Sequence, residues 1–242
     1  MRRKILHGLE VEDFIHPRES TAKKFANASS AVRNFLGSAS SLCATAVDPV
    51  TQGTFVKISA PKLLKIASDV CRILDVSPVP EIYLCHLMSR DIMPLGSDAP
   101  YLVVPDYTLR YSDDDMLYYN FGNAVAMIKA DHVELEMLAA YMPGGMLVNA
   151  ARIIFTQYLH CADATSDRGG LLACQSFAAA VRNHFWELIR FFDQHNGGKE
   201  TFFVIQLDDV DSQIKYGYQV MDDIRKYLVI PNQINQYYCL NH

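Results

Sequence analysis

Apolar side chains recur at helical spacing in several parts of the chain and predict a mainly helical protein. The clearest stripe runs from Leu63 to Leu74 and follows Pro61. Proline fits the first turn of a helix, because the N–H that it lacks would have no partner there. A weaker pattern predicts another helix within residues 13–41, packed on the main body of the fold.

The longest predicted helix begins at Ser112–Asp115 and runs to Met142. Ser and Asp cap the free N–H groups of a helix start, and acidic side chains stabilise its positive end. Pro143–Gly145 is expected to end this helix. A second helical region is then expected from Met146 to about Asp193.

Short β-prone segments at residues 53–59, 81–85 and 100–105 predict three strands, with a loop between the last two. Prolines stand on both sides of the third strand. Because proline cannot donate to an interior ladder, we expect this strand to lie at an edge of the sheet. The predicted edge comprises Tyr101, Leu102, Val103 and Val104. The expected fold class is α+β, mainly α, with a small sheet packed on long helices.

The length of 242 residues suits one domain with a substantial core. We expect residues 1–195 to form this domain, including an N-terminal helical extension. Gln194–Gly198 is the clearest linker, and residues 196–242 are expected to pack on the same domain with a helix near 210–228.

The composition argues against several classes of protein. A net charge of −5, with no basic cluster beyond Arg2–Lys4, argues against a nucleic-acid partner. The six cysteines have no CxxC spacing, so neither a zinc ribbon nor a disulfide framework is expected. The longest apolar stretch, residues 135–155, is interrupted by Pro143–Gly145 and carries charged residues, which argues against membrane insertion. The start lacks the pattern of a secretory signal, so we expect a cytoplasmic protein.

Two runs on the long helices carry the candidate chemistry. Residues 122–132 read GNAVAMIKADH, and residues 163–173 read DATSDRGGLLA. Together with the strands and the acidic cap before them, these runs resemble the HtpX-type and CAAX prenyl endopeptidase-type zinc metallopeptidases, particularly their soluble bacterial members. The corresponding family runs read GHELGHxxxxH and ExxxDRxGLLA. The resemblance covers roughly residues 1–185 and implies a zincin-like fold.

The resemblance also implies a role for each aligned position. In such enzymes two His residues and a Glu on the second helix bind zinc, and a Glu between the His residues is the general base. The His positions are Asn123 and Met127 here, the base is Ala124, and the third ligand is Asp163. Asp167 matches the carboxylate that orients a ligating His, and its expected partner is therefore Asn123.

These replacements predict that zinc is lost and that zinc-dependent peptidase activity is absent. Asn is a weak neutral ligand, Met is a soft thioether, and Ala cannot accept a proton. The expected function is a catalytically inactive metallopeptidase-like protein, a pseudopeptidase, that binds a peptide or protein beside the predicted edge strand. It could instead be a structural or regulatory subunit that pairs with an active homologue or with itself. The alternative is a metal-dependent peptidase with non-standard ligands.

A metal site formed by other residues is a less favoured alternative. Its possible ligands are His132, His160, Cys161, Asp163 and Asp167. His132, however, lies on the apolar stripe of its helix, where a histidine is more often a core residue with a hydrogen-bond partner. No GxSxG run points to a serine hydrolase.

Overall fold

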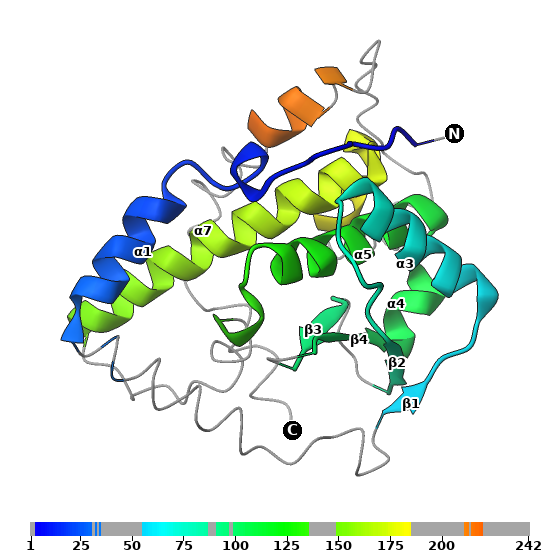
Figure 1. The fold of residues 1–242 in the computed structure, drawn as a ribbon, viewed down its shortest axis with the longest axis horizontal. Helices are drawn as coiled ribbons and strands as arrows, with labels where there is room; N and C mark the ends of the chain where they lie inside the picture. The colour runs from blue at the N-terminus through cyan, green and yellow to red at the C-terminus, as the bar shows by residue number, and fades with distance from the viewer. Residues whose placement is uncertain are drawn as a thin grey trace, which may run out of the picture.

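A computed structural model describes residues 3–30, 32, 34, 55–86, 91–96, 99–135, 149–184, 211–212 and 214–219. Within these residues the fold is α+β and mainly helical, as predicted (Figure 1). In chain order the elements are η1 (Val11–Asp13), α1 (Glu19–Ala28), β1 (Val56–Lys57), α3 (Pro61–Ile73), β2 (Ile82–Cys85), β3 (Met93–Leu95), β4 (Tyr101–Pro105), α4 (Asp106–Tyr111), α5 (Asp114–Lys129) and α7 (Asn149–Cys174). Residues 177–184 are also helical, as are the described residues of 211–219.

Helix α5 lies between the long helix α7 and the small sheet (Figure 1). Helix α1 runs along α7, and α3 packs beside α5. One core joins all these layers, because Leu102 of β4, Phe121 of α5 and Leu171 of α7 belong to the same buried cluster.

The strand order in the sheet is β1-β2-β4-β3. Strand β4 pairs in parallel with β2 and antiparallel with β3, so the prediction that residues Tyr101, Leu102, Val103 and Val104 form an edge is wrong. The flanking prolines do not interrupt the ladder, since Pro100 precedes the strand and Pro105 is its last residue. The actual edges are β1 and the three-residue β3, which the sequence pattern left in a loop.

Helix α5 starts as predicted but ends earlier. Asp113 is its N-cap, and its side chain accepts a hydrogen bond from the Met116 backbone N–H at 2.8 Å. The helix ends at Lys129 rather than Met142. Asp131 adopts the left-handed region with φ of 59°, and the His132 N–H donates to the Met127 carbonyl at 2.8 Å. This is a Schellman ending with aspartate in the position usually held by glycine.

The other predicted elements differ mainly in length. Helix α3 begins at Pro61 as expected. Helix α1 lies within the predicted segment 13–41, part of which is outside the described residues, and β1 comprises only Val56–Lys57. The short helix α4 was not predicted. The predicted Pro143–Gly145 turn, the Gln194–Gly198 linker and the β-prone segment at 201–205 lie outside the described residues. No helix in the described ranges is long and apolar enough to cross a membrane.

Candidate functional site

Glycines allow α5 and α7 to approach closely. A Cβ atom added to Gly122 would lie 2.4 Å from the Ala173 Cβ, and one added to Gly169 would lie 2.1 Å from the Ala126 Cβ. The pairs 122–173 and 126–169 step in opposite directions along the chain, so the two helices are antiparallel. This contact fixes the register in which the candidate site residues face one another.

Asn123 and Asp167 meet across this helix pair. The Asn123 side-chain N–H donates to Oδ1 of Asp167 at 3.0 Å. The predicted partnership of these two residues is thereby confirmed. Asp167 is only 4% exposed, so the bond joins the helices inside the protein.

Two further side chains surround the Asp167 carboxylate. The Tyr119 hydroxyl donates to its Oδ1 at 3.0 Å, and Nε2 of His184 lies 3.6 Å from its Oδ2. The Tyr119 hydroxyl also lies 2.7 Å from Nε2 of His184. The carboxylate of α7 is thus surrounded by side chains from two other helical segments, α5 and residues 177–184. Sequence reasoning did not identify Tyr119 or His184, because an aromatic core residue and a histidine about 65 positions later share no local pattern.

The remaining aligned positions offer little for hydrolysis. Ala124 is completely buried and carries no group that could accept a proton. Met127 and Asp163 are each partly exposed. Residue 127 is four positions after 123, and residue 163 is four positions before 167. Because the helices are antiparallel, residues 127 and 163 both lie about one helical turn from the Asn123–Asp167 pair, in the same direction along the contact. Nδ1 of His160 lies 3.9 Å from Oδ2 of Asp163, at the limit of an ion pair.

These residues do not fit a catalytic zinc ion. Such a site needs three nitrogen, sulfur or carboxylate ligands of the protein and an open position for water. The aligned positions offer an amide, a thioether and a single carboxylate, while the Asp167 carboxylate already accepts protein hydrogen bonds. In the described part of the chain, no group of three or more His, Cys, Asp or Glu side chains is arranged to hold a metal ion.

His132 belongs to a separate buried contact, as its place on the apolar stripe indicated. It is 1% exposed, and its Nε2 lies 2.7 Å from Oε1 of Glu19, which is 3% exposed. The Thr165 hydroxyl donates to the other carboxylate oxygen of Glu19, and the His16 backbone N–H donates to the Thr165 oxygen at 2.9 Å. Glu19 of α1 therefore connects to the end of α5 through His132 and to α7 through Thr165.

The pKa of Glu19 reflects this environment. Burial by itself would raise the pKa, but the hydrogen bond and charge of His132 and the hydrogen bond of Thr165 outweigh it, so the pKa lies below its ordinary value. Glu19 was not predicted as a site residue, because a glutamate in the first turn of a helix usually reads as a solvated charge near the positive helix end.

Strand β3 forms one edge of the sheet and contacts helix α5. The Leu102 N–H donates to the Glu81 carbonyl at 2.8 Å and so faces β2 rather than β3. Pro94 lies opposite Leu102, and in an antiparallel pair its carbonyl therefore faces outward. Proline has no N–H, so at this position the edge offers an acceptor without a donor. Strand addition at β3 is correspondingly limited.

Comparison of the chain with protein-family models, with curated proteins and with solved structures finds no significant match.

Proposed function

We propose that this protein is a catalytically inactive domain of the zincin metallopeptidase type, which binds a peptide or protein or serves as a structural or regulatory subunit. The observation that carries the proposal is the 3.0 Å hydrogen bond between Asn123 and Asp167. In a zinc peptidase the corresponding carboxylate orients a ligating imidazole. Here the amide of Asn123 supplies the same N–H donor and offers no imidazole nitrogen to a metal.

The zinc ligands and the general base that differ in this chain are the groups on which each part of the hydrolytic mechanism would depend. Zinc polarises the substrate carbonyl and lowers the pKa of the attacking water, and a carboxylate general base takes the proton. Asn123 and Met127 replace the two nitrogen ligands, and the buried methyl of Ala124 replaces the base. Residues that pack the helices, such as Gly122 and Gly169, remain small and tightly fitted.

Recognition of a partner would use side chains more than backbone hydrogen bonds. Strand β4 is interior, and Pro94 of the edge strand β3 is buried and has no N–H to donate. Asn123 and Met127 are the aligned positions of α5 that keep some exposure. A methionine suits a binding surface, because its flexible thioether adapts to apolar groups of different shape.

Metal binding tests the proposal through reversion. The variant Asn123→His, Ala124→Glu, Met127→His and Asp163→Glu restores each aligned zinc ligand and the base. We expect the wild-type protein to bind no zinc after equilibrium dialysis and elemental analysis, and we expect the variant to bind about one equivalent. Stoichiometric zinc in the wild-type protein would refute the loss of the site.

A matched control separates a real site from adventitious binding to added histidines. The control variant carries the same changes at positions 123, 124 and 127 but has Asp163→Ala, which removes the third ligand. Its zinc affinity is expected to fall by tenfold or more relative to the full reversion. Equal affinities would mean that α7 does not supply a ligand and that the alignment of the two helices with a zincin site is wrong.

Native mass spectrometry distinguishes the two forms of the proposal. A stable homo-oligomer of the wild-type chain at micromolar concentration favours a structural subunit that pairs with itself. A monomer favours the binding of a different peptide or protein.

A further inference from the structure

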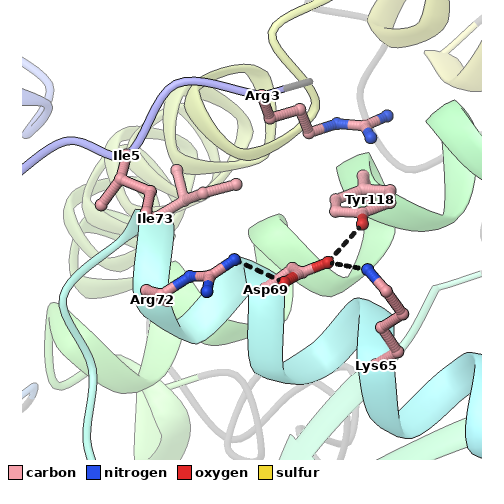
Figure 2. Close-up of a pocket in the computed structure, with 7 residues that line it drawn as sticks. All are labelled: Arg3, Ile5, Lys65, Asp69, Arg72, Ile73 and Tyr118. Atoms are coloured by element: carbon pink, nitrogen blue, oxygen red, sulfur yellow. Dashed lines mark hydrogen bonds and ion pairs between the residues drawn. The ribbon is translucent and has the colours of Figure 1, made fainter. Parts of the chain in front are cut away.

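A pocket of about 270 Å³ lies between the N-terminal segment, α3 and α5 (Figure 2). It is lined by Arg3, Ile5, Lys65, Asp69, Arg72, Ile73 and Tyr118. Three of these side chains are cationic and one is anionic, although the whole chain has a net charge of −5. The positive lining is therefore a local feature of this pocket.

Asp69 holds the two cations of α3 in place. Its carboxylate accepts hydrogen bonds from Lys65 Nζ at 2.7 Å, from Arg72 Nη2 at 2.7 Å and from the Tyr118 hydroxyl at 2.9 Å (Figure 2). The hydrogen bond from Lys65, together with those from Tyr118 and the charge of Arg72, lowers the pKa of Asp69 despite its partial burial. The cations would otherwise be mobile surface side chains, so Asp69 reduces the ordering that a ligand would have to impose on them.

Arg3 is fixed by a different set of contacts. Its Nε donates to the Cys174 carbonyl at 3.2 Å, its Nη2 pairs with Asp115, and its guanidinium carbon lies 3.4 Å from the centre of the Tyr118 ring. The side chain is only 15% exposed. Arg3 stands above Tyr118, across the pocket from Arg72 (Figure 2).

The backbone that carries Arg3 is also anchored. The Gln175 side-chain oxygen accepts from the Lys4 N–H at 2.7 Å, and its amide N–H donates to the Lys4 carbonyl at 2.6 Å. Gln175 is buried. The N-terminal segment is thus held against the end of α7 by a two-bond contact, which keeps Arg3 at the pocket.

We propose that this pocket binds a small ligand that carries a phosphate group. A guanidinium has five N–H donors, and the contacts of Arg3 and Arg72 with described residues leave several of these donors for a ligand. Planar guanidinium groups match phosphate oxygens, and a dianion matches two arginines and a lysine better than a single carboxylate does.

The size of the pocket and the residues that line it suit a phosphate ester as well as the free phosphate ion. A volume of about 270 Å³ leaves room for an organic group beside a phosphate. Ile5 and Ile73 form an apolar wall on the side opposite Tyr118 (Figure 2). None of the lining residues is an aligned zinc-site position, so this inference does not depend on the proposed function.

Isothermal titration calorimetry of the full chain with inorganic phosphate and with phenyl phosphate tests the inference. We expect binding of phosphate-bearing probes that weakens as salt is raised, and no binding of phenol, which lacks the phosphate. The variant Arg72→Gln is expected to weaken binding about tenfold, because it removes a charged donor. Arg72 is exposed on α3, so this change should leave the fold intact.

The control variant is Arg110→Gln. Arg110 is likewise exposed and likewise bonded to an aspartate on its own helix, Asp106, but it does not line the pocket. Its phosphate affinity should equal that of the wild-type protein. Tighter binding of phenyl phosphate than of inorganic phosphate would identify an ester as the natural class, and equal binding would identify the free ion.

Two results would overturn the inference. The first is an absence of binding of either probe by the wild-type protein at millimolar concentration. The second is binding that Arg72→Gln and Lys65→Gln leave unchanged, because the probe would then occupy some other basic surface.

Discussion

At the scale of single residues, Asn123 illustrates how an amide can serve a buried carboxylate across a helix pair without offering a ligand to a metal. The hydrogen bond to Asp167 requires only an N–H donor at the correct place, which an amide provides as well as an imidazole. Zinc ligation requires a free nitrogen lone pair, which the amide does not offer. The two demands are separable, so the helix pair can keep its buried carboxylate satisfied without a metal.

Glu19 provides a prediction about pH at the same scale. Its pKa is lowered in the folded protein, so its stabilising contribution is complete above the unfolded value near 4.5 and is lost as pH falls through the lower folded value. The variant Glu19→Gln keeps the shape but removes the charge. We expect the free energy of unfolding at pH 7 to fall by about 2 kcal/mol. We also expect the variant to lose less stability than the wild-type protein between pH 5 and pH 3, as measured by urea denaturation.

Glu81→Gln is the matched control for that measurement. Glu81 also has a lowered pKa, caused first by its hydrogen bond from Lys57 and then by that from Tyr83, but it lies at the surface where solvent screens the charge. Its removal should change stability little. If the free energy of unfolding of Glu19→Gln falls as steeply between pH 5 and pH 3 as that of the wild-type protein, the ionisation of Glu19 is not the cause of the acid sensitivity.

At the scale of elements, the close contact of α5 with α7 predicts an exchange of small residues. Gly169→Ala places a Cβ 2.1 Å from the Ala126 Cβ, and no other atom lies closer than 3.5 Å. The clash should cost about 3 kcal/mol, which exceeds the roughly 1 kcal/mol gained from replacing glycine within a helix.

The double variant Gly169→Ala with Ala126→Gly should recover most of this loss. The swap keeps one glycine and one alanine at the contact, so the helix propensities balance and the overlap is removed. Thermal or urea denaturation of the two single variants and the double variant gives the coupling energy. Additive effects in this cycle would mean that the helices do not touch at these positions.

The sequence predicted elements where local signals agree and failed where a distant contact decides. Helix α3 was predicted because Pro61 and an apolar stripe both mark it. The end of α5 was missed because Asp131, rather than glycine, takes the left-handed position. The hydrogen bond of the following His132 with Glu19, more than a hundred residues away, also leaves no local signal. The interior place of β4 follows from its pairing with β2 and β3, which flanking prolines do not reveal.

The residues of the candidate site also divide into those that the sequence predicted and those that it did not. The resemblance of the two helical runs to metallopeptidase motifs predicted that Asn123 and Asp167 meet, and the structure shows their hydrogen bond. The close approach of the helices at Gly122 and Gly169 brings the two residues together. Tyr119 and His184 could not be assigned to this site from the sequence. Their contact depends on how residues 177–184 fold back beside α5, and no repeat or motif records that arrangement.

At the scale of the whole molecule, the N-terminal segment is fastened along α7 by contacts between distant residues (Figure 1). Lys4 meets Gln175 at one end of α7, the Ile15 carbonyl accepts from Arg168, and Glu19 meets Thr165 further along. These contacts close a chain loop of about 150 to 170 residues, so their formation must follow or accompany the docking of α7.

Gln175 is the residue through which this closure can be tested. Gln175→Met keeps the length of the side chain but leaves the Lys4 N–H and carbonyl without their partner. We expect a loss of about 2 kcal/mol in the free energy of unfolding, and faster hydrogen–deuterium exchange at Lys4 and Ile5. The free energy of unfolding of Gln175→Glu should lie between those of the wild-type protein and Gln175→Met. The variant retains an acceptor for the Lys4 N–H but loses the donor to the Lys4 carbonyl.

Amides within α5 serve as the internal reference for the exchange experiment, since their exchange should change only as much as global stability does. If the N-terminal amides slow or stay unchanged in Gln175→Met while α5 behaves as expected, the segment is held by its other contacts with α7, and Arg3 owes its position to Tyr118, Asp115 and the Cys174 carbonyl.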